Sequence, residues 1–154
     1  MTEPAPPRVD FYVLKSTAAQ PRWLLACRLA EKAYLRDMRV VILTETAGDA
    51  ATLDDLLWTF NERSFVPHAV CIDAAAVDAA APVQLTANPA GGPAGGLLVN
   101  LSNGLPADPQ RFARIAEIVD ADAERRRLGR DRFKAYRDLK MTLETHQLAP
   151  TADA

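Results

Sequence analysis

The run "RVVILT" at residues 39–44 decides the fold class of this chain. Its residues 40–43 are apolar and mostly β-branched, which is typical of a parallel strand covered by helices on both faces. The segment before it, residues 21–37, repeats apolar side chains at helical spacing behind Pro21 and therefore predicts a helix. Residues 9–14, "VDFYVL", predict a mostly buried strand before that helix.

The same alternation of strands and helices continues toward the C-terminus. Residues 46–60 predict a second helix, with Thr46 as its N-cap and Asp49 three residues later. Further strands are predicted near 69–72, at 82–86 and at 97–102, with residues 87–96 as a loop. Residues 108–120 predict a helix that begins at Asp108 and Pro109. The basic segment that follows predicts a terminal helix ending near residue 143.

This order of elements predicts an α/β protein. We expect a Rossmann-like three-layer fold with a mostly parallel sheet and without a nucleotide-binding glycine motif. The chain of 154 residues is about one domain long. We expect that single α/β domain over residues 9–143, a disordered N-terminus over 1–8 and a loose C-terminal tail over 144–154.

The composition narrows the function classes. The net charge of −2 and the pI near 5.7 disfavour a nucleic-acid coat protein, which is usually basic throughout. No apolar run approaches the roughly 20 residues that span a bilayer. The N-terminus lacks the apolar segment of a signal peptide, so we expect a cytoplasmic location. Cys27 and Cys71 lie in apolar stretches, which favours buried thiols over a disulfide, a metal site or a nucleophile.

The sequence lacks the motifs that an α/β enzyme would need. The segment after the first predicted strand, "KSTAAQPRW", holds no glycine, whereas a Rossmann site needs glycines there so that the backbone can approach the pyrophosphate. No P-loop pattern occurs. Ser64 and His68 are close in sequence, but no nucleophile elbow or orienting acid accompanies them. We therefore expect no catalytic residue, metal or cofactor, and keep a nucleotide-dependent enzyme as an alternative.

The basic stretch "RRRLGRDRFKAYR" at residues 125–137 carries the strongest functional signal. On a helix most of its cations fall on one side. The other side, which is predicted to contact the core, holds Leu128, Ala135 and Leu139, with Tyr136 at its edge. The predicted basic stripe contains Arg126, Arg130, Lys134, Arg137 and Lys140. Phe133 lies in the middle of that stripe, which suits an acidic peptide ending in a hydrophobic residue. A solvated basic face, and single-stranded nucleic acid stacked on Phe133, are the alternatives.

Several segments resemble the chi subunit of bacterial DNA polymerase III, a family of accessory clamp-loader proteins. They are "FYVL", "ACRLAEKAYLRDMRVVILTE", "LDDLLWTFNERSFVPH", "LLVNLS" and "RFKAYR", in the family's order and over most of the chain. The elements "LW…SFVPH" and "KAYR" are the specific ones. The resemblance implies a Rossmann-like fold without nucleotide binding. It also implies a non-enzymatic replisome adaptor that links single-stranded DNA-binding protein to the clamp loader, with no membrane contact and only indirect contact with DNA.

The resemblance further implies two binding surfaces. The acidic, hydrophobic-ended C-terminal tail of the single-stranded DNA-binding protein would bind Arg126, Arg130 and Lys134, beside Phe133 where relatives have tyrosine. The psi subunit of the clamp loader, or an accessory helicase, would bind a second surface. That surface comprises Trp58, Phe65, Val66 and Pro67. Judged without the resemblance, Trp58 follows an apolar helical stripe and could belong to the core instead.

Overall fold

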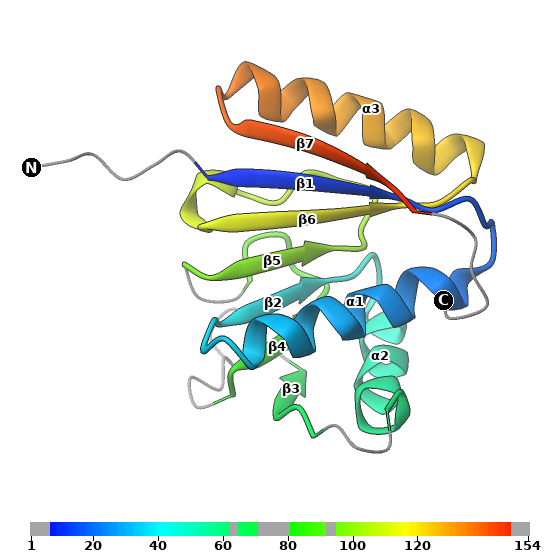
Figure 1. The fold of residues 1–154 in the computed structure, drawn as a ribbon, viewed down its shortest axis with the longest axis vertical. Coiled ribbons are helices and arrows are strands. Elements are labelled where there is room, and N and C mark those ends of the chain that lie inside the picture. Colours follow the sequence, from blue (N-terminus) through cyan, green and yellow to red (C-terminus); the bar gives the residue numbers. More distant parts are fainter. Residues whose placement is uncertain (1–6, 62–64, 71–80, 92–94, 149–154) are drawn as a thin grey trace, which may run out of the picture.

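A seven-stranded sheet organises the protein. The computed structural model describes residues 7–61, 65–70, 81–91 and 95–148. The strand order is β3-β4-β2-β5-β6-β1-β7, and every neighbouring pair in it runs parallel. The strands are β1 (Arg8–Val13), β2 (Val40–Leu43), β3 (His68–Val70), β4 (Val83–Thr86), β5 (Leu97–Asn100), β6 (Arg114–Val119) and β7 (Thr142–Gln147). The predicted α/β class is confirmed, and the sheet is parallel throughout these strands (Figure 1).

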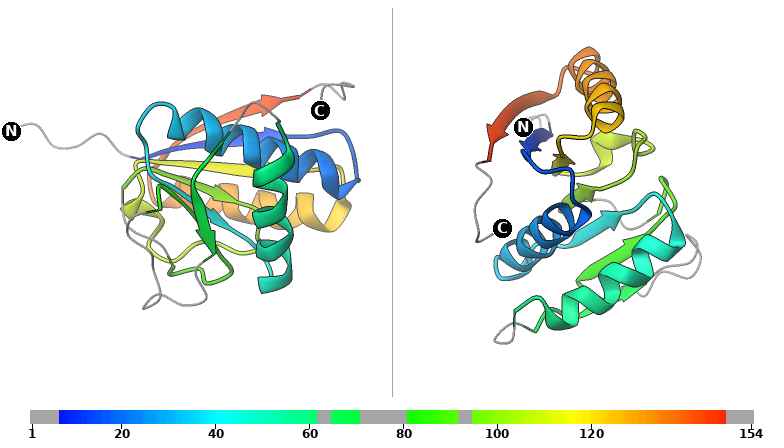
Figure 2. Two further views of the ribbon diagram at one scale, coloured as in Figure 1. Left: turned by 90° about the horizontal axis from the view of Figure 1, so that it is seen from below. Right: turned by 90° about the vertical axis from the view of Figure 1, so that its right-hand side faces the viewer.

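Three helices cover the two faces of this sheet. They are α1 (Ala19–Tyr34), α2 (Ala47–Thr59) and α3 (Ala123–Asp138). Alternate residues of β2 show the layering, since Val40 and Ile42 join the core beneath α1 and α2, whereas Val41 and Leu43 join the core beneath α3. The result is the predicted three-layer arrangement, with α3 on the opposite face from α1 (Figure 2).

The predicted second helix is confirmed, together with its cap. The backbone N–H of Asp49 donates to Oγ1 of Thr46 at 3.0 Å, so the threonine satisfies one of the free donors at the start of α2. Cys27 of α1 is a free, fully buried thiol, as predicted. Burial raises its pKa to about 12, which keeps it protonated and unreactive. Ser64 and Cys71 lie outside the described residues.

The predicted helix over residues 108–120 is wrong. Asp108 has φ 44° and makes no side-chain cap, and only the three residues Pro109–Arg111 form a 3-10 turn, η2. Residues 114–119 instead form β6, a central strand between β5 and β1 whose last five residues are buried. The Asp-Pro pair fits a helix start locally, but burial of "IAEIV" between two strands overrides it.

The predicted end of the last helix and the predicted C-terminal tail are also wrong. α3 ends at Asp138, and Lys140, with φ 61°, turns the chain back before residue 143. Residues 144–147 are not a loose tail, because β7 pairs in parallel with β1 from Arg8↔Thr142 to Val13↔Gln147. β7 is a mostly exposed edge strand with a polar sequence, so no buried apolar pattern marks it. None of the described helices is long and apolar enough to cross a membrane.

Candidate functional site

The helix α3 contacts the sheet through a polar face. Its buried residues are Gly129, Arg132 and Tyr136. The predicted core side is therefore only partly right: Tyr136, expected at its edge, is buried, but Leu128 and Ala135 are only half-buried, and Leu139 is 39% exposed. Helical periodicity assigns the apolar side to the core, but here a buried acid in the sheet selects a different face of the helix.

That acid is Glu117, in the middle of β6 and fully buried. Its carboxylate accepts hydrogen bonds from Nε of Arg132 at 3.0 Å, from the Tyr136 hydroxyl at 2.6 Å and from Nδ2 of Asn100 at 2.8 Å. Arg132 also donates to the carbonyl of Asn103 at 2.9 Å. Because Arg132 and Tyr136 of α3 both donate hydrogen bonds to the Glu117 carboxylate in the sheet, the network fixes the rotation of the helix about its own axis.

This rotation leaves a pocket of about 250 Å³ between α3 and the strands beneath it. Its lining comes from β1, β6, β7 and α3. The residues are Phe11, Val13, Val119, Arg126, Gly129, Arg130, Phe133 and Thr145. Gly129 permits the close approach of α3 to β6, since a Cβ atom there would lie 3.1 Å from Cγ2 of Val119. The pocket combines an apolar floor with two arginines on the helix.

The cations of α3 divide into two groups. Arg125 forms a two-pronged pair with Asp120 at 2.8 and 2.9 Å, and Arg127 is paired with Glu124. Arg130 forms no hydrogen bond or ion pair with the described residues. Arg126 donates only to backbone carbonyls, of Asp120 at 3.0 Å and of Leu14 at 3.4 Å. Within the described part of the chain, the two arginines that line the pocket thus have no carboxylate partner, so their charge is available to a ligand.

Phe133 is half-buried rather than fully exposed. Its ring centroid lies 5.3 Å from that of Phe11 at an angle of 56°, and it packs against the core beneath α3. The same ring lines the pocket beside Arg130. One part of the ring is therefore anchored to the sheet, and another part contributes apolar surface next to a free cation.

The structure brings together three of the five residues predicted for this surface. Arg126, Arg130 and Phe133 line the pocket, whereas Lys134 and Arg137 are exposed on α3 outside it. The residues that sequence reasoning missed come mainly from the strands, such as Phe11 and Thr145. Alternation along β1 could have placed Phe11 and Val13 on one face, but only the tertiary fold shows that α3 covers that face.

A second surface lies at the end of α2. Trp58 is 47% exposed and Phe65 is 68% exposed, and their ring centroids lie 5.2 Å apart. Trp58 is therefore not a core residue. Of the other two residues predicted here, Pro67 is half-buried, but Val66 is completely buried, so its side chain cannot contact a partner directly.

His68 packs against Trp58 of this aromatic pair. Its Nδ1 lies 2.7 Å from the carbonyl oxygen of Val66, and its Nε2 lies 3.0 Å from that of Asp54. The ring of Trp58 packs on the imidazole at 4.3 Å between centroids. Because both ring nitrogens are occupied, His68 holds the loop and the indole in place and is not presented to solvent.

Sequence comparisons with known proteins show the family of this chain. A protein-family profile described as "DNA polymerase III chi subunit, HolC" matches residues 7–144. The chain belongs to the DNA polymerase III chi subunit family. It is 38% identical to DNA polymerase III subunit chi of Pseudomonas aeruginosa over 141 residues, which cover 92% of this chain and 96% of that protein. It is 27% identical to subunit chi of Escherichia coli over 125 residues, or 79% of this chain and 82% of that protein.

The Haemophilus influenzae subunit chi is 25% identical over 140 residues, 90% of this chain and 96% of that protein. The three alignments cover between 79% and 92% of this chain. Family membership therefore rests on sequence similarity over most of the chain and not on one motif. It confirms the resemblance indicated by the "LW…SFVPH" and "KAYR" segments.

In this chi-family chain, protein side chains occupy the edge of the sheet where α/β proteins commonly bind nucleotides. That edge lies at the carboxyl ends of the strands. Arg22, 8% exposed at the start of α1, donates to the carbonyl of Leu101 at 3.0 Å and lies 4.0 Å from Asp120. Burial opposes the charge of Asp120, but hydrogen bonds from Arg125 and a backbone N–H outweigh it and lower the Asp120 pKa. An ion cluster, rather than a glycine loop, fills this edge.

Among the described residues, one group of side chains has the composition of a metal site. Ligand atoms of Asp10, Glu144 and His146 lie within 4.8 Å of one another. Arg8 and Arg114 also donate to Asp10, both at 3.0 Å. Burial disfavours the Asp10 carboxylate, but hydrogen bonds from His146 and the two arginines lower its pKa. Two guanidinium groups on the shared carboxylate repel a divalent cation, so this cluster is better suited to ion pairing than to metal binding.

Proposed function

We propose that this chi-family protein is a non-enzymatic replisome adaptor whose α3 pocket binds the acidic C-terminal tail of single-stranded DNA-binding protein. The observation that carries the proposal is the joint presence, in one pocket of about 250 Å³, of an apolar floor and two arginines without carboxylate partners. An acidic peptide that ends in a hydrophobic residue matches both features. The terminal aromatic side chain would rest on Phe11 and Phe133, and its carboxylates would pair with Arg126 and Arg130.

Guanidinium groups suit this ligand because they can bond a carboxylate through two N–H donors at once. Arg126 is already oriented by its two bonds to backbone carbonyls, so less side-chain freedom is lost when it binds. The pocket is open and small, and each exposed ion pair contributes little by itself. We expect a dissociation constant in the micromolar range, equivalent to about −8 kcal/mol. Several tails on one coated DNA strand would raise the effective concentration.

A calorimetric titration tests this proposal. A synthetic peptide with acidic residues and a C-terminal phenylalanine should bind the full chain with one site, and more weakly as salt is raised. Changing the terminal phenylalanine to alanine should weaken binding about tenfold or more, because the apolar floor then has no partner. A single-stranded oligonucleotide without bound protein should not compete. Competition by the oligonucleotide, with no heat from the peptide, would favour direct nucleic-acid binding through α3 instead.

We also propose that the aromatic surface of Trp58 and Phe65 binds the psi subunit of the clamp loader or an accessory helicase. Two large, exposed and mutually packed aromatic side chains are typical of the anchors that dominate protein interfaces. His68 holds the indole from behind, so little ordering is needed on binding. The two surfaces are separate, since one is at the end of α2 and the other lies under α3 on the opposite face of the sheet (Figure 2).

Substitution at the second surface should separate the two partners. In a pull-down from lysate with identification by mass spectrometry, Phe65→Ala should lose the clamp-loader or helicase component and still capture the single-stranded DNA-binding protein. Leu35→Ala is the matched control, because Leu35 is a comparable hydrophobic residue, 72% exposed, at the C-cap of α1. Equal loss in both variants would contradict the assignment of the surface to Trp58 and Phe65.

A nucleotide-dependent enzyme is the remaining alternative for this fold. The absence of glycine after β1 and the ion cluster of Arg22 and Asp120 at the carboxyl edge both speak against it. We therefore propose that the protein has no catalytic site of its own and that it acts in the cytoplasm, in contact with other replication proteins. No turnover of ATP or NAD is the expected result of an activity assay, and measurable turnover would support the enzyme instead.

A further inference from the structure

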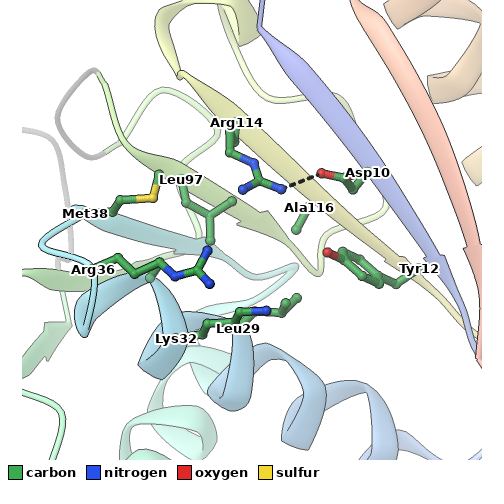
Figure 3. Close-up of a pocket in the computed structure, with 10 residues that line it drawn as sticks. Asp10, Tyr12, Leu29, Lys32, Arg36, Met38, Leu97, Arg114 and Ala116 are labelled. Atoms are coloured by element: carbon green, nitrogen blue, oxygen red, sulfur yellow. Dashed lines mark hydrogen bonds and ion pairs between the residues drawn. The ribbon is translucent and has the colours of Figure 1, made fainter.

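Side chains of β1 line two pockets, one on each face of the sheet. Phe11 and Val13 point to the pocket under α3, and the alternate residues Asp10 and Tyr12 point to the opposite face. There they line a smaller hollow, of about 80 Å³, beside the last turns of α1. Figure 3 shows Lys32, Arg36 and Arg114 around this hollow, with Leu97 and Ala116 forming its floor.

Several hydrogen-bond donors at this hollow have no partner among the residues that the structure describes. Lys32, in the last turn of α1, and Arg36, just after its C-cap, are both exposed, and neither forms a hydrogen bond or ion pair with the described residues. The Tyr12 hydroxyl likewise has no bond within the described chain. Burial raises the pKa of Tyr12, so this hydroxyl stays protonated and can donate. Nε of Arg114 is shut off from solvent and has no acceptor, while its NH2 group donates to Asp10.

The charges around the hollow do not balance. Lys32, Arg36 and Arg114 contribute three cations, and Asp10 is the single carboxylate in the lining. Asp10 is, moreover, already shared among Arg8, Arg114 and His146. Lys32 and Arg36 are four residues apart at the C-terminal end of α1, and their like charges repel each other. A favourable interaction with the C-terminal end of the α1 dipole offsets part of this repulsion. It does not account for a third cation on the sheet opposite them.

We propose that this hollow is a binding site for a phosphate group, either free phosphate or pyrophosphate or the phosphate of a small mononucleotide. A doubly charged, compact oxyanion matches the excess of two positive charges better than a single carboxylate does. It would accept hydrogen bonds from Lys32, Arg36 and Tyr12 at once. The floor of Leu97 and Ala116 excludes water from one side, which strengthens these interactions.

Nuclear magnetic resonance titration of the isotope-labelled full chain tests this proposal at constant ionic strength. Pyrophosphate should shift the amide signals of Tyr12, Leu97 and Ala116 in a saturable manner, with an apparent dissociation constant of about 1 mM or below. Phosphate and deoxyadenosine monophosphate are the second and third probes. Binding of the mononucleotide at least as tight as that of pyrophosphate identifies a phosphorylated metabolite as the source, and binding of pyrophosphate alone identifies a free anion.

The variant Lys32→Gln/Arg36→Gln should weaken pyrophosphate binding about tenfold or more, because it removes the two cations at the end of α1 that have no partner among the described residues. The matched control is Lys134→Gln/Arg137→Gln, which removes the same charge from an exposed part of α3 outside its pocket and should leave pyrophosphate binding within about twofold. Equal weakening in both variants, or shifts that never saturate, would overturn the site. The Lys32→Gln/Arg36→Gln variant should still bind the acidic peptide normally, so this outcome is independent of the function proposed for the α3 pocket.

Discussion

Replacing Arg132 by methionine is expected to lower the free energy of unfolding by about 3–5 kcal/mol, the largest effect of any substitution considered for this protein. The variant leaves Glu117 fully buried without its cationic partner. In a chain of this length the loss corresponds to a fall in melting temperature of about 10 °C. Urea denaturation followed by circular dichroism measures the loss directly.

The loss should also depend on pH. Burial raises the pKa of Glu117, and the charge of Arg132 is the strongest influence that lowers it. Without Arg132 the pKa of Glu117 in the folded state rises further above its unfolded value of about 4.3. The folded state then binds a proton that the unfolded state releases, so stability falls as pH rises through this interval. We expect the deficit of the variant to be larger at about pH 8 than at about pH 5.

Two further variants keep this prediction testable if Arg132→Met fails to fold. Tyr136→Phe removes only the hydroxyl that donates to Glu117 at 2.6 Å and should cost about 1–3 kcal/mol. The double variant Glu117→Gln/Arg132→Met removes the buried charge and should recover part of the stability and lose the pH dependence. A pH-independent deficit that is the same in the single and double variants would show that lost packing, not an unpaired carboxylate, causes the effect.

The sequence predicts the strands of the sheet better than it predicts which faces of the helices are buried. Strands β1, β2, β4 and β5 are predictable because apolar runs of strand length lie between turn residues. β6 has the same kind of run, but the Asp108–Pro109 pair before it also fits the start of a helix. A choice between the two depends on whether β5 and β1 leave a gap in the sheet, and that is a property of the assembled fold.

The candidate site was predictable only on its charged side. Arg126, Arg130 and Phe133 follow from helical spacing, since they lie on one face of α3 whichever face packs inward. The pocket floor does not follow, because it depends on the rotation that Glu117 imposes on α3. Periodicity assumes that the apolar side of a helix faces the core. Here hydrogen bonds from Arg132 and Tyr136 to a buried carboxylate outweigh that tendency.

Arg130→Gln is expected to weaken binding of the acidic tail peptide about fivefold to tenfold, which corresponds to about 1–1.4 kcal/mol. Arg130 lines the pocket and forms no pair with the described residues, so its charge is available in full to the peptide carboxylates. The free energy of unfolding should hardly change, because the substitution breaks no hydrogen bond or ion pair within the described part of the chain. Calorimetry at two salt concentrations should show that the variant has a shallower salt dependence than the wild type.

Arg127→Gln is the matched control for this prediction. Arg127 is only three residues from Arg130, but it does not line the pocket. Its side chain is 56% exposed and is paired with Glu124 and Asp131. The control removes the same formal charge from the same helix, so the general electrostatic attraction of α3 for an acidic peptide falls equally. If the two variants bind the peptide equally well, attraction is diffuse and the pocket is not the site. A fivefold difference between them would instead require a local contact of the peptide with Arg130. The hydrophobic end of the tail would then bind the adjacent apolar surface of Phe133.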